Sequence, residues 1–394
     1  MTELRNVALV GGATIPWGVR RETWSELAQE IGGALFQSVP SLRPADVDSL
    51  FLGAAEPERF AFQSHVAPLC AEQMGLTPHK ILQRTELACA SGQSAIRSAY
   101  AAIAAGLSDV AVAVGVEKMN LPSMAEANSA MACVMDRAWD GAHGATAPPF
   151  FAMVAQRHML EHGTPPEALS AVSEKNHRFA NANPNAQFFG KTFDRAKLER
   201  LPLVAPPLRL GDCSSMTDGA AAVVLAAEPL ARQYTDTPVF VRGTGQYSDF
   251  HNLANAGSLT NWVGLRQASR AAYAMAGIGP AEVDFAEVHD CFTISEIIEY
   301  EALGFCPPGE GGKFVLDGRS GLGGDVVVNP RGGLLGCGHP LGATGIGQAV
   351  EVFDQFAGRA PTARKVADPR WALVHNLSGS ANVHSVMIYE GGAS

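Results

Sequence analysis

Two patterns of hydrophobic and polar positions recur along this chain. Apolar residues three and four apart predict helices with one buried face, and short apolar runs bounded by glycine or proline predict buried strands. After residue 90, for example, Ile96, Ala99 and Ile103 share one helical face, and Gly106 ends the helix. The patterns predict strands over 6–11, 49–53, 110–114, 218–225, 239–243, 285–288 and 371–375, and helices over 22–38, 151–162, 166–179, 264–277 and 344–357.

The order of these elements repeats in the second half of the chain. The segment Pro280-Ala281-Glu282-Val283-Asp284 echoes Pro44-Ala45-Asp46-Val47-Asp48, and each leads into a predicted strand. We interpret this as an internal duplication, with one half over 1–237 and the other over 238–394. Two βαβ-rich halves packed together would bring the helix after Cys89 and the helix after His339 to one central cleft.

Between residues 116 and 207 the periodicity weakens, and proline, methionine, asparagine and histidine accumulate. We interpret this stretch as a long excursion that covers one face of the main sheet. Excursions of this kind often carry binding surface, with a plain structural insertion as the alternative.

Composition excludes several classes of protein. The chain is 47% hydrophobic and 17% charged, which fits a compact α/β enzyme and not a disordered chain. The net charge is −10 without a basic run, so we expect no nucleic-acid partner. No apolar run is long enough to span a membrane, and no signal peptide is visible at the N-terminus.

The cysteines point to a reducing compartment. Their number is odd and no CxxC pair occurs, which argues against a disulfide framework or a structural zinc site. We therefore expect reduced thiols and a cytoplasmic location. The seven are Cys70, Cys89, Cys133, Cys213, Cys291, Cys306 and Cys337.

Cys89 is the first candidate for chemistry, because it lies where a loop becomes a helix. Free N–H groups and the helix dipole at that position would stabilise a thiolate, which is the nucleophilic form. Small neighbours in Ala88-Cys89-Ala90-Ser91-Gly92 leave room for a substrate. The alternative is a buried structural cysteine.

A glycine-rich tract over 332–345 holds the second candidate, His339. A histidine between Gly338 and Pro340 lies in a fixed loop with open space around it, where it could deprotonate a thiol or polarise a carbonyl. A structural histidine is the alternative. Cys337 is two residues away and is a rival nucleophile.

Two further signals follow predicted strands. His289 and Cys291, two residues apart after the strand 285–288, would suit proton transfer or oxyanion donation, and a metal site is the rival interpretation. The strand 371–375 turns into a loop of small residues around Ser378 and Gly379, which could supply backbone N–H donors.

Together these motifs resemble the thiolase family over nearly the whole chain. The tract Cys89-Ala90-Ser91-Gly92 matches the nucleophile motif, and Gly338-His339-Pro340-Leu341-Gly342-Ala343-Thr344-Gly345 matches the signature around the catalytic histidine. His289-Asp290-Cys291-Phe292 resembles the sterol-carrier-protein-X type branch, since other thiolases carry Asn-Glu-Ala-Phe there. The tracts 304–312 and 329–335 also resemble that branch, and we expect no sterol-carrier domain to follow.

The resemblance implies a thiolase-like fold, with two duplicated α/β halves in a five-layered α-β-α-β-α arrangement. The inserted loop domain, about 116–207, would cover coenzyme A. It further implies a role in lipid metabolism and a homodimer or dimer of dimers. Acyl-CoA and CoA would be substrates, with no resident cofactor and no metal.

The resemblance also implies a role for each motif residue. Cys89 would attack the acyl carbonyl and form an acyl-enzyme. His339 would accept the thiol proton and then help to stabilise the thioester oxyanion, a role that His289 would share. Cys291 would be the acid/base; ordinary thiolases place this second cysteine in the C-terminal loop, where this chain has Asn376. Backbone N–H groups of Cys89 and of Ser378 or Gly379 would form a second oxyanion hole.

The expected reaction is thiolytic cleavage of a 3-ketoacyl-CoA, or the reverse condensation. One alternative is a retro-aldol lyase that acts on steroid side-chain CoA esters with a small OB-fold partner protein, although such relatives lack the nucleophilic cysteine. A second alternative is a non-catalytic acyl-CoA-binding subunit. The intact set of Cys89, His289, Cys291 and His339 argues against it, because a binding subunit does not need these reactive side chains. A ketosynthase is disfavoured by the glycine and proline around His339.

Overall fold

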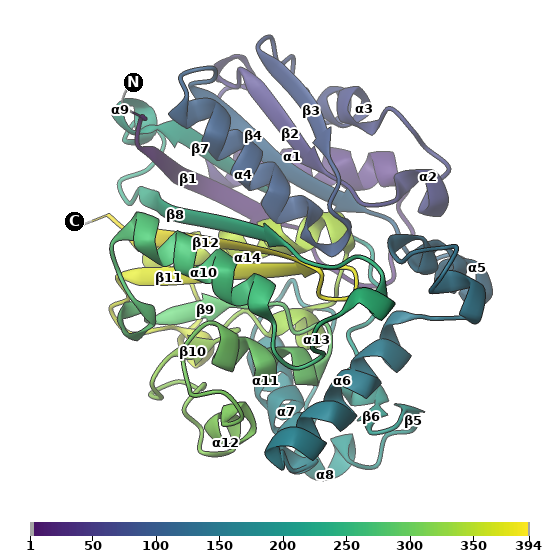
Figure 1. Ribbon diagram of the computed structural model, residues 1–394. Coiled ribbons are helices and arrows are strands. Elements are labelled where there is room, and N and C mark those ends of the chain that lie inside the picture. Colours follow the sequence, from purple (N-terminus) through teal and green to yellow (C-terminus); the bar gives the residue numbers. More distant parts are fainter. Residues whose placement is uncertain (1–3, 393–394) are drawn as a thin grey trace.

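The computed structural model describes residues 4–392, in which ten strands form one mixed sheet and two further strands form a small separate sheet (Figure 1). The strand order is β10-β9-β11-β12-β8-β1-β7-β4-β2-β3. The N-terminal half of the sheet holds β1 (Val7–Thr14), β2 (Ser49–Gly53), β3 (Ile81–Thr85), β4 (Val110–Glu117) and β7 (Gly219–Ala227). The C-terminal half holds β8 (Val239–Ser248), β9 (Phe285–Glu287), β10 (Val327–Val328), β11 (Trp371–Ser378) and β12 (Val383–Gly391).

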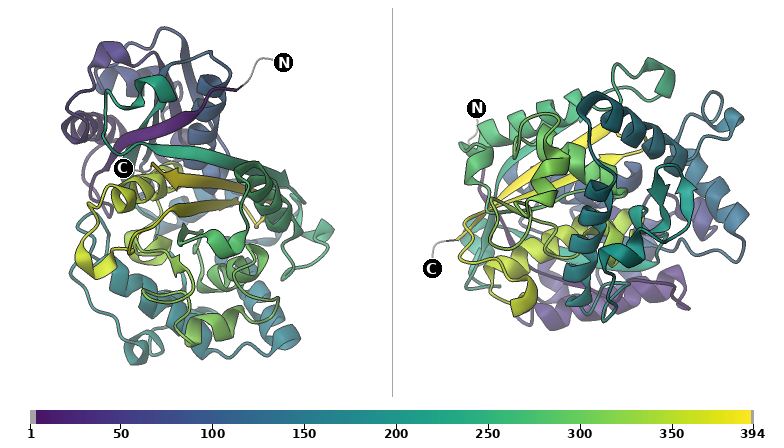
Figure 2. Two further views of the ribbon diagram at one scale, coloured as in Figure 1. Left: turned by 90° about the vertical axis from the view of Figure 1, so that its left-hand side faces the viewer. Right: turned by 90° about the horizontal axis from the view of Figure 1, so that it is seen from below.

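The two halves of the sheet meet between β1 and β8. Only two residue pairs join these strands, Ala8 with Phe240 and Leu9 with Val239. Figure 2 shows the halves one above the other, with the N-terminal half uppermost in its left-hand view. A single continuous sheet therefore runs through both halves of the chain.

Three large hydrophobic cores lie between five layers, because the two halves of the sheet form separate layers on either side of α4 and α14. The outer core of the N-terminal half packs α1 (Trp24–Ser38) and α3 (Val66–Gln73) against the sheet. The middle core contains α4 (Ser91–Ala104) and α14 (Leu341–Phe356) and draws on strands of both halves. The third core packs α10 (Val263–Ala276) and α11 (Thr293–Ala302) against the C-terminal half. This order of layers confirms the predicted α-β-α-β-α fold.

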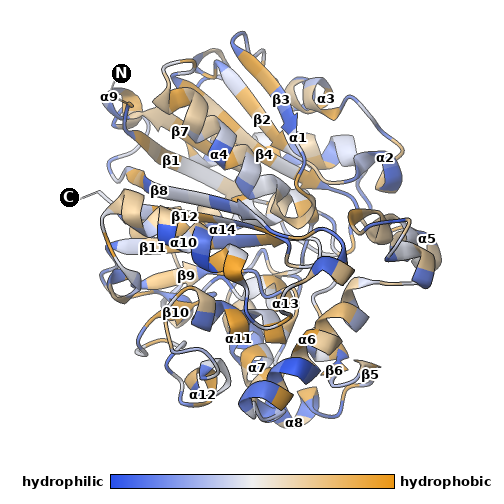
Figure 3. Ribbon diagram, in the orientation of Figure 1, coloured by the Kyte–Doolittle hydropathy of each residue, from blue (hydrophilic) through white to orange (hydrophobic). Residues whose placement is uncertain are grey.

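Local sequence explains most of these elements. Helix α1 begins at a capping box, in which the side chains of Thr23 and Glu26 each accept a hydrogen bond from the other residue's backbone N–H. Helix α10 buries Leu265, Ala268 and Ala272 on one face, and Figure 3 shows hydrophilic and hydrophobic residues side by side along it. Strands β4 and β7 are buried on both faces, as their continuous apolar runs predict.

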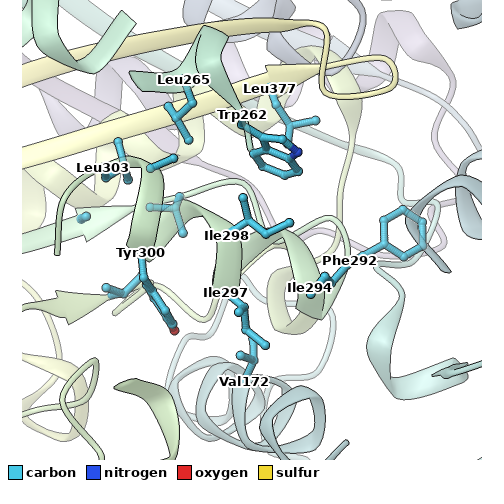
Figure 4. Close-up of a cluster of buried hydrophobic side chains, with 14 of the residues drawn as sticks. Val172, Trp262, Leu265, Phe292, Ile294, Ile297, Ile298, Tyr300, Leu303 and Leu377 are labelled. Carbon is cyan, nitrogen blue, oxygen red and sulfur yellow. The ribbon is translucent and has the colours of Figure 1, made fainter. Parts of the chain in front are cut away.

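The excursion after β4 packs mainly against the C-terminal half. Figure 1 shows α6 and α7 beside α11, and Phe151 and Val172 from these helices join the core of that half. Figure 4 shows Val172 beside Ile297 of α11. The elements of the excursion are α5 (Met124–Met131), α6 (Ala147–His162), α7 (Glu167–Asn181), α8 (Arg195–Leu198), β5 (Leu203–Ala205) and β6 (Leu208–Arg209).

Short helices complete the fold. They are α2 (Pro57–Phe60), α9 (Glu228–Ala231), α12 (Gly311–Leu316) and α13 (Gly333–Cys337). Within residues 4–392, every helix is too short or too polar to cross a membrane.

Candidate active site

The starts of α4 and α14 meet at a contact between glycines. A Cβ atom at Gly92 would lie 2.5 Å from the carbonyl oxygen of Gly342, and a Cβ at Gly342 would lie 2.4 Å from the carbonyl oxygen of Gly53. No side chain fits between these backbones. The predicted convergence of the two helices, which brings the Cys89 and His339 loops to one place, is therefore confirmed.

Cys89 lies in a tight turn directly before α4. Ala88 has a φ of +43°, in the left-handed region that non-glycine residues rarely adopt. The buried hydroxyl of Ser91 holds the turn, because it accepts a hydrogen bond from the Leu87 N–H (2.9 Å) and donates one to the Ala88 carbonyl (2.7 Å). The small residues on either side of Cys89 allow this tight turn, and they also leave space around the sulfur.

His339 is fixed in one tautomer by its own helix. The Thr344 hydroxyl donates to the Pro340 carbonyl (2.9 Å), so it must accept from Nδ1–H of His339, 2.7 Å away. The other ring nitrogen, Nε2, then carries no proton and has no hydrogen-bond partner among residues 4–392. The His339 backbone N–H donates to the Thr217 hydroxyl (3.1 Å), which anchors the loop. His339 is thus arranged to accept a proton at Nε2.

Asp290 joins the His289 loop to the glycine-rich tract. Its carboxylate accepts hydrogen bonds from the backbone N–H groups of Leu334 (2.7 Å) and Leu335 (3.2 Å). A Cβ at Gly333 would lie 2.1 Å from an Asp290 carboxylate oxygen, and Gly333 has a φ of +60°. This close approach explains a glycine at position 333.

Cys89, His289 and His339 form one buried cluster. One Sγ or ring-nitrogen atom from each lies within 4.8 Å of the others. The two imidazole rings meet edge to face, with centroids 4.9 Å apart. His289 is fully buried, and neither of its ring nitrogens has a hydrogen-bond partner within the described chain. The histidines can therefore both direct a nitrogen at a group bound to the sulfur.

A cavity of about 200 Å³ opens onto this cluster. Cys89, His339 and Cys291 line it, and the excursion supplies much of the remaining wall, as expected of a stretch that carries binding surface. The wall is mostly apolar and rich in methionine, a residue that adapts its shape to a ligand. Apolar lining residues include Met119, Met131, Met135, Ala147, Phe150, Phe151, Met216, Phe292 and Leu377.

Burial decides the protonation of the resting site. It raises the pKa of the Cys89 thiol to about 12, although backbone N–H groups of Gly379 and of Cys89 itself favour the thiolate. Burial lowers the pKa of His339 to about 3. The expected thiolate at the helix start is therefore wrong for the resting enzyme: loss of water outweighs the helix dipole, and a neutral thiol faces a neutral imidazole.

Cys291 is held close to the same site. Its backbone N–H donates to the His289 carbonyl (2.8 Å), and its carbonyl accepts from the Ser214 N–H (2.9 Å). Its sulfur lies 3.7 Å from the Ser295 hydroxyl. Burial, and then the nearby Cys89 sulfur, raise the pKa of Cys291 well above its ordinary value, so the thiol is a proton donor at neutral pH.

The C-terminal loop presents Gly379 and not Ser378 to the cavity. Gly379 lines the cavity and directs its backbone N–H toward Cys89, whereas Ser378 ends β11 and accepts from the Asn382 N–H (3.2 Å). Asn376 is fully buried, and its amide donates to Gln348 (2.5 Å) away from the cavity lining.

The structure separates the rival candidates. Cys337 is fully buried outside the cavity lining, where its thiol donates to the Arg331 carbonyl (3.1 Å). The sequence placed the rival metal site at His289 and Cys291. In the structure the side chains with the spacing of metal ligands are His289, His339 and Cys89. Cys291 is not part of that set.

Sequence analysis missed two groups beside the site. Glu117, at the end of β4, accepts hydrogen bonds from the N–H groups of Ala55 (2.8 Å) and Gly342 (2.9 Å), and an acid at the end of a buried strand was its only signal. Glu299, His375 and His384 are buried together behind the same loops. Their positions in the sequence give no sign that they meet.

Comparison with known proteins places these features in a family. Residues 7–229 match the family model "Thiolase, N-terminal domain", and residues 245–391 match "Thiolase C-terminal domain-like". The chain is 40% identical over 390 residues to an acetyl-CoA acetyltransferase of Methanothermobacter thermautotrophicus, covering 98% of this chain and 100% of that protein. It is 34% identical to the benzoylsuccinyl-CoA thiolase subunit BbsB of Thauera aromatica, over 87% of each chain.

Other similarities are more distant. Sterol carrier protein 2 of Bos taurus is 34% identical over 77% of this chain and 58% of that protein. The Ltp2-ChsH2(DUF35) aldolase has a similar fold, with a TM-score of 0.86 and 23% identity over both whole chains. Human mitochondrial 3-ketoacyl-CoA thiolase in complex with CoA gives a TM-score of 0.75 and 18% identity, again over both whole chains.

Proposed function

This chain belongs to the thiolase family of acyltransferases, in its sterol-carrier-protein-X type branch, and on that premise we propose that it cleaves a 3-ketoacyl-CoA with CoA, or runs the reverse condensation, through an acyl group on Cys89. One observation carries the proposal: Cys89, His289 and His339 place reactive atoms within 4.8 Å at the end of a cavity that Cys291 also lines.

In the first half-reaction His339 Nε2 takes the proton of the Cys89 thiol as sulfur attacks the 3-keto carbon. The bond between the α and β carbons then breaks, and its electron pair passes to the departing acetyl-CoA as an enolate. The Cys291 thiol protonates the enolate carbon. His289 and the protonated His339 stabilise the negative charge on the thioester oxygen.

In the second half-reaction the CoA thiol attacks the acyl-Cys89 thioester. The Cys291 thiolate accepts the CoA proton, and Cys89 leaves with the proton that His339 held. The backbone N–H groups of Gly379 and Cys89 stabilise the oxyanion of the tetrahedral intermediate. Each group returns to its starting protonation state, so the cycle closes. CoA is a substrate in this scheme, which uses no resident cofactor and no metal.

Intact mass spectrometry tests the covalent step. Wild type incubated with acetoacetyl-CoA should gain one acetyl group, and Cys89→Ala should gain none. Cys133→Ala is a matched control, since Cys133 is only partly buried and is not among the residues that line the cavity. An equal adduct on Cys89→Ala would place acyl transfer elsewhere and refute the mechanism.

The retro-aldol lyase is the second candidate, because the fold of this chain is similar to that of an aldolase. A lyase that needs no nucleophile would retain turnover in Cys89→Ala when it is given a steroid side-chain CoA ester. A requirement for a small OB-fold partner protein belongs to this alternative. Turnover by the purified chain alone would contradict such a requirement.

We further propose a homodimer or dimer of dimers. Support comes from β3, an edge strand of the sheet in which four of five residues are partly or fully exposed and Leu82 is 40% exposed. Light scattering should give a mass of at least two chains; a single-chain mass would refute the assembly. The division into 1–237, with the loop domain at about 116–207, and 238–394 stays a prediction, as do a role in lipid metabolism and the cytoplasmic location.

A further inference from the structure

Three buried titratable side chains outside the mechanism link α11 to the turn after β11. Glu299 of α11, His375 of β11 and His384 of β12 are at most 1% exposed. Oε1 of Glu299 lies 3.2 Å from Nδ1 of His375. Nε2 of His375 lies 3.1 Å from Nδ1 of His384, and Nε2 of His384 lies 3.0 Å from the Ala381 carbonyl oxygen. Glu299, His375 and His384 therefore form a row of contacts that ends on the turn containing Gly379.

The end of the row fixes the direction of its hydrogen bonds. A carbonyl oxygen only accepts, so His384 must carry its proton on Nε2. Burial lowers the pKa of His384 to about 4, which leaves the ring neutral and Nδ1 bare. His384 Nδ1 can then only accept, so His375 must donate to it from Nε2–H.

The same reasoning reaches Glu299. Burial lowers the pKa of His375 well below its ordinary value, so its Nδ1 is bare and faces the carboxyl group. An ionised Glu299 carboxylate would set two hydrogen-bond acceptors against each other. Neither oxygen of the Glu299 carboxyl group, nor Nδ1 of His375, has a well-directed hydrogen-bond partner among residues 4–392. Burial, followed by the charges of Asp290 and Glu296, raises the pKa of Glu299, whereas the backbone N–H of His289 opposes the rise. A proton on the carboxyl group would remove the conflict between acceptors at this 3.2 Å separation and would let Glu299 donate to His375.

The turn held by this row is under strain. Gly379 and Ala381 both have a φ of +56°, and at Ala381 that conformation is unfavourable for any side chain. The hydrogen bond from His384 to the Ala381 carbonyl stabilises it. His384 itself has little freedom, because a Cβ at Gly264 would lie 2.9 Å from its ring and the Trp262 ring packs 5.5 Å away. Figure 4 shows Trp262 among the hydrophobic side chains around α11.

We propose that Glu299, His375 and His384 are positioning residues for acyl transfer: a protonated Glu299 begins a one-way row of hydrogen bonds that fixes the turn and holds the Gly379 N–H against the Cys89 sulfur. The inference rests on the proposed function, since positioning matters only if Cys89 is the nucleophile. The row acts through the backbone of the turn and touches no substrate atom.

Two substitutions at Glu299 test the protonated carboxyl group. The amide of Glu299→Gln can donate to His375 Nδ1 as the acid does, so kcat should stay within about threefold of wild type. Glu299→Leu has no donor, and kcat should fall about tenfold while KM changes little. If Glu299→Gln loses as much kcat as Glu299→Leu, a carboxylate is required and the proposal is overturned.

Two substitutions at His384 test the link to Cys89. His384→Phe keeps an aromatic ring but cannot donate to Ala381, so iodoacetamide should alkylate Cys89 about tenfold more slowly at one pH, and kcat should fall with it. His384→Gln can both donate and accept, and should restore most of both rates. Unchanged alkylation in a folded His384→Phe would overturn the proposal. Circular-dichroism melting curves establish that each variant is folded.

A measurement on the resting enzyme separates this proposal from the proposed function. Nitrogen NMR of protein labelled with ¹⁵N-histidine should show His375 and His384 neutral, each with its proton on Nε2, whereas His339 should carry its proton on Nδ1. A doubly protonated His375 at neutral pH would overturn the row even if wild type forms the acetyl adduct. Absence of the adduct with intact tautomers would refute the proposed function instead.

Discussion

The glycine contact between α4 and α14 gives a prediction whose magnitude follows from one distance. Gly92→Ala would place its Cβ 2.5 Å from the Gly342 carbonyl oxygen, whereas real Cβ atoms essentially never approach within 3.0 Å. The helix starts must therefore separate by at least 0.5 Å, the difference between these distances. The obstacle is backbone, so no side-chain rotation relieves it.

Overpacking of this kind costs about 1–3 kcal/mol of unfolding free energy. It also moves Cys89 away from His339, because each residue lies within a few positions of the contact. A displacement of about 1 Å costs about a hundredfold in rate, so half of that predicts a loss of about tenfold in kcat. The effect on activity should thus exceed what the loss of folded protein alone would give.

Gly33→Ala is the matched control. Gly33 lies inside α1, is exposed, and has no other group of the described chain within 4 Å of an added Cβ. The same chemical change should there increase stability by about 0.5–1 kcal/mol, since alanine loses less backbone freedom in a helix. Urea unfolding followed by circular dichroism measures both variants, and thiolysis of acetoacetyl-CoA gives kcat. A Gly92→Ala protein as stable and active as wild type would refute the reasoning.

Three further predictions follow from the site. Because the pKa of Cys89 is raised to about 12, the thiolate fraction rises with pH, and alkylation of Cys89 should accelerate about tenfold per unit from pH 7 to 10; a plateau below pH 8 would contradict the buried neutral thiol. Thr344→Val leaves His339 Nδ1–H without an acceptor and should lower kcat about ten- to hundredfold, with Thr344→Ser close to wild type; equal kcat for the two would contradict the fixed tautomer. Dialysis against a chelator should leave turnover unchanged, whereas a loss restored by Zn²⁺ would favour the metal interpretation of Cys89, His289 and His339.

Periodicity and motifs predicted the parts of this molecule that local sequence determines. The strand over 49–53 matches β2, and the repeated order of elements led correctly to two helices that start at one cleft. Helix α11 was missed, although Ile294, Ile297 and Ile298 lie three and four positions apart in its sequence. All ten of its residues are buried, Glu296 and Glu299 included, so its polar face packs inside the protein and not toward solvent. Strand β12 was also missed.

The protonation of the site could not be predicted in the same way. A helix start stabilises a thiolate by about 0.3–1 kcal/mol, a contribution visible in sequence. Desolvation of the Cys89 sulfur depends on cavity-lining residues that lie far along the chain, such as Phe151 and Leu377, and it outweighs that contribution. The row of Glu299, His375 and His384 is hidden for the same reason, since a helix and two strands bring it together.

The neutral resting thiol of Cys89 affects how the enzyme reacts with oxidants. Peroxides and disulfides react with thiolates, and burial raises the pKa of Cys89 to about 12, so very little of it is ionised at pH 7. Between turnovers the enzyme would resist sulfenic acid formation and mixed disulfides with small thiols. Its reactivity is released only when His339 takes the proton in the presence of an acyl group. Sensitivity to oxidative damage is in this way confined to the brief interval in which the sulfur is already forming a bond to carbon.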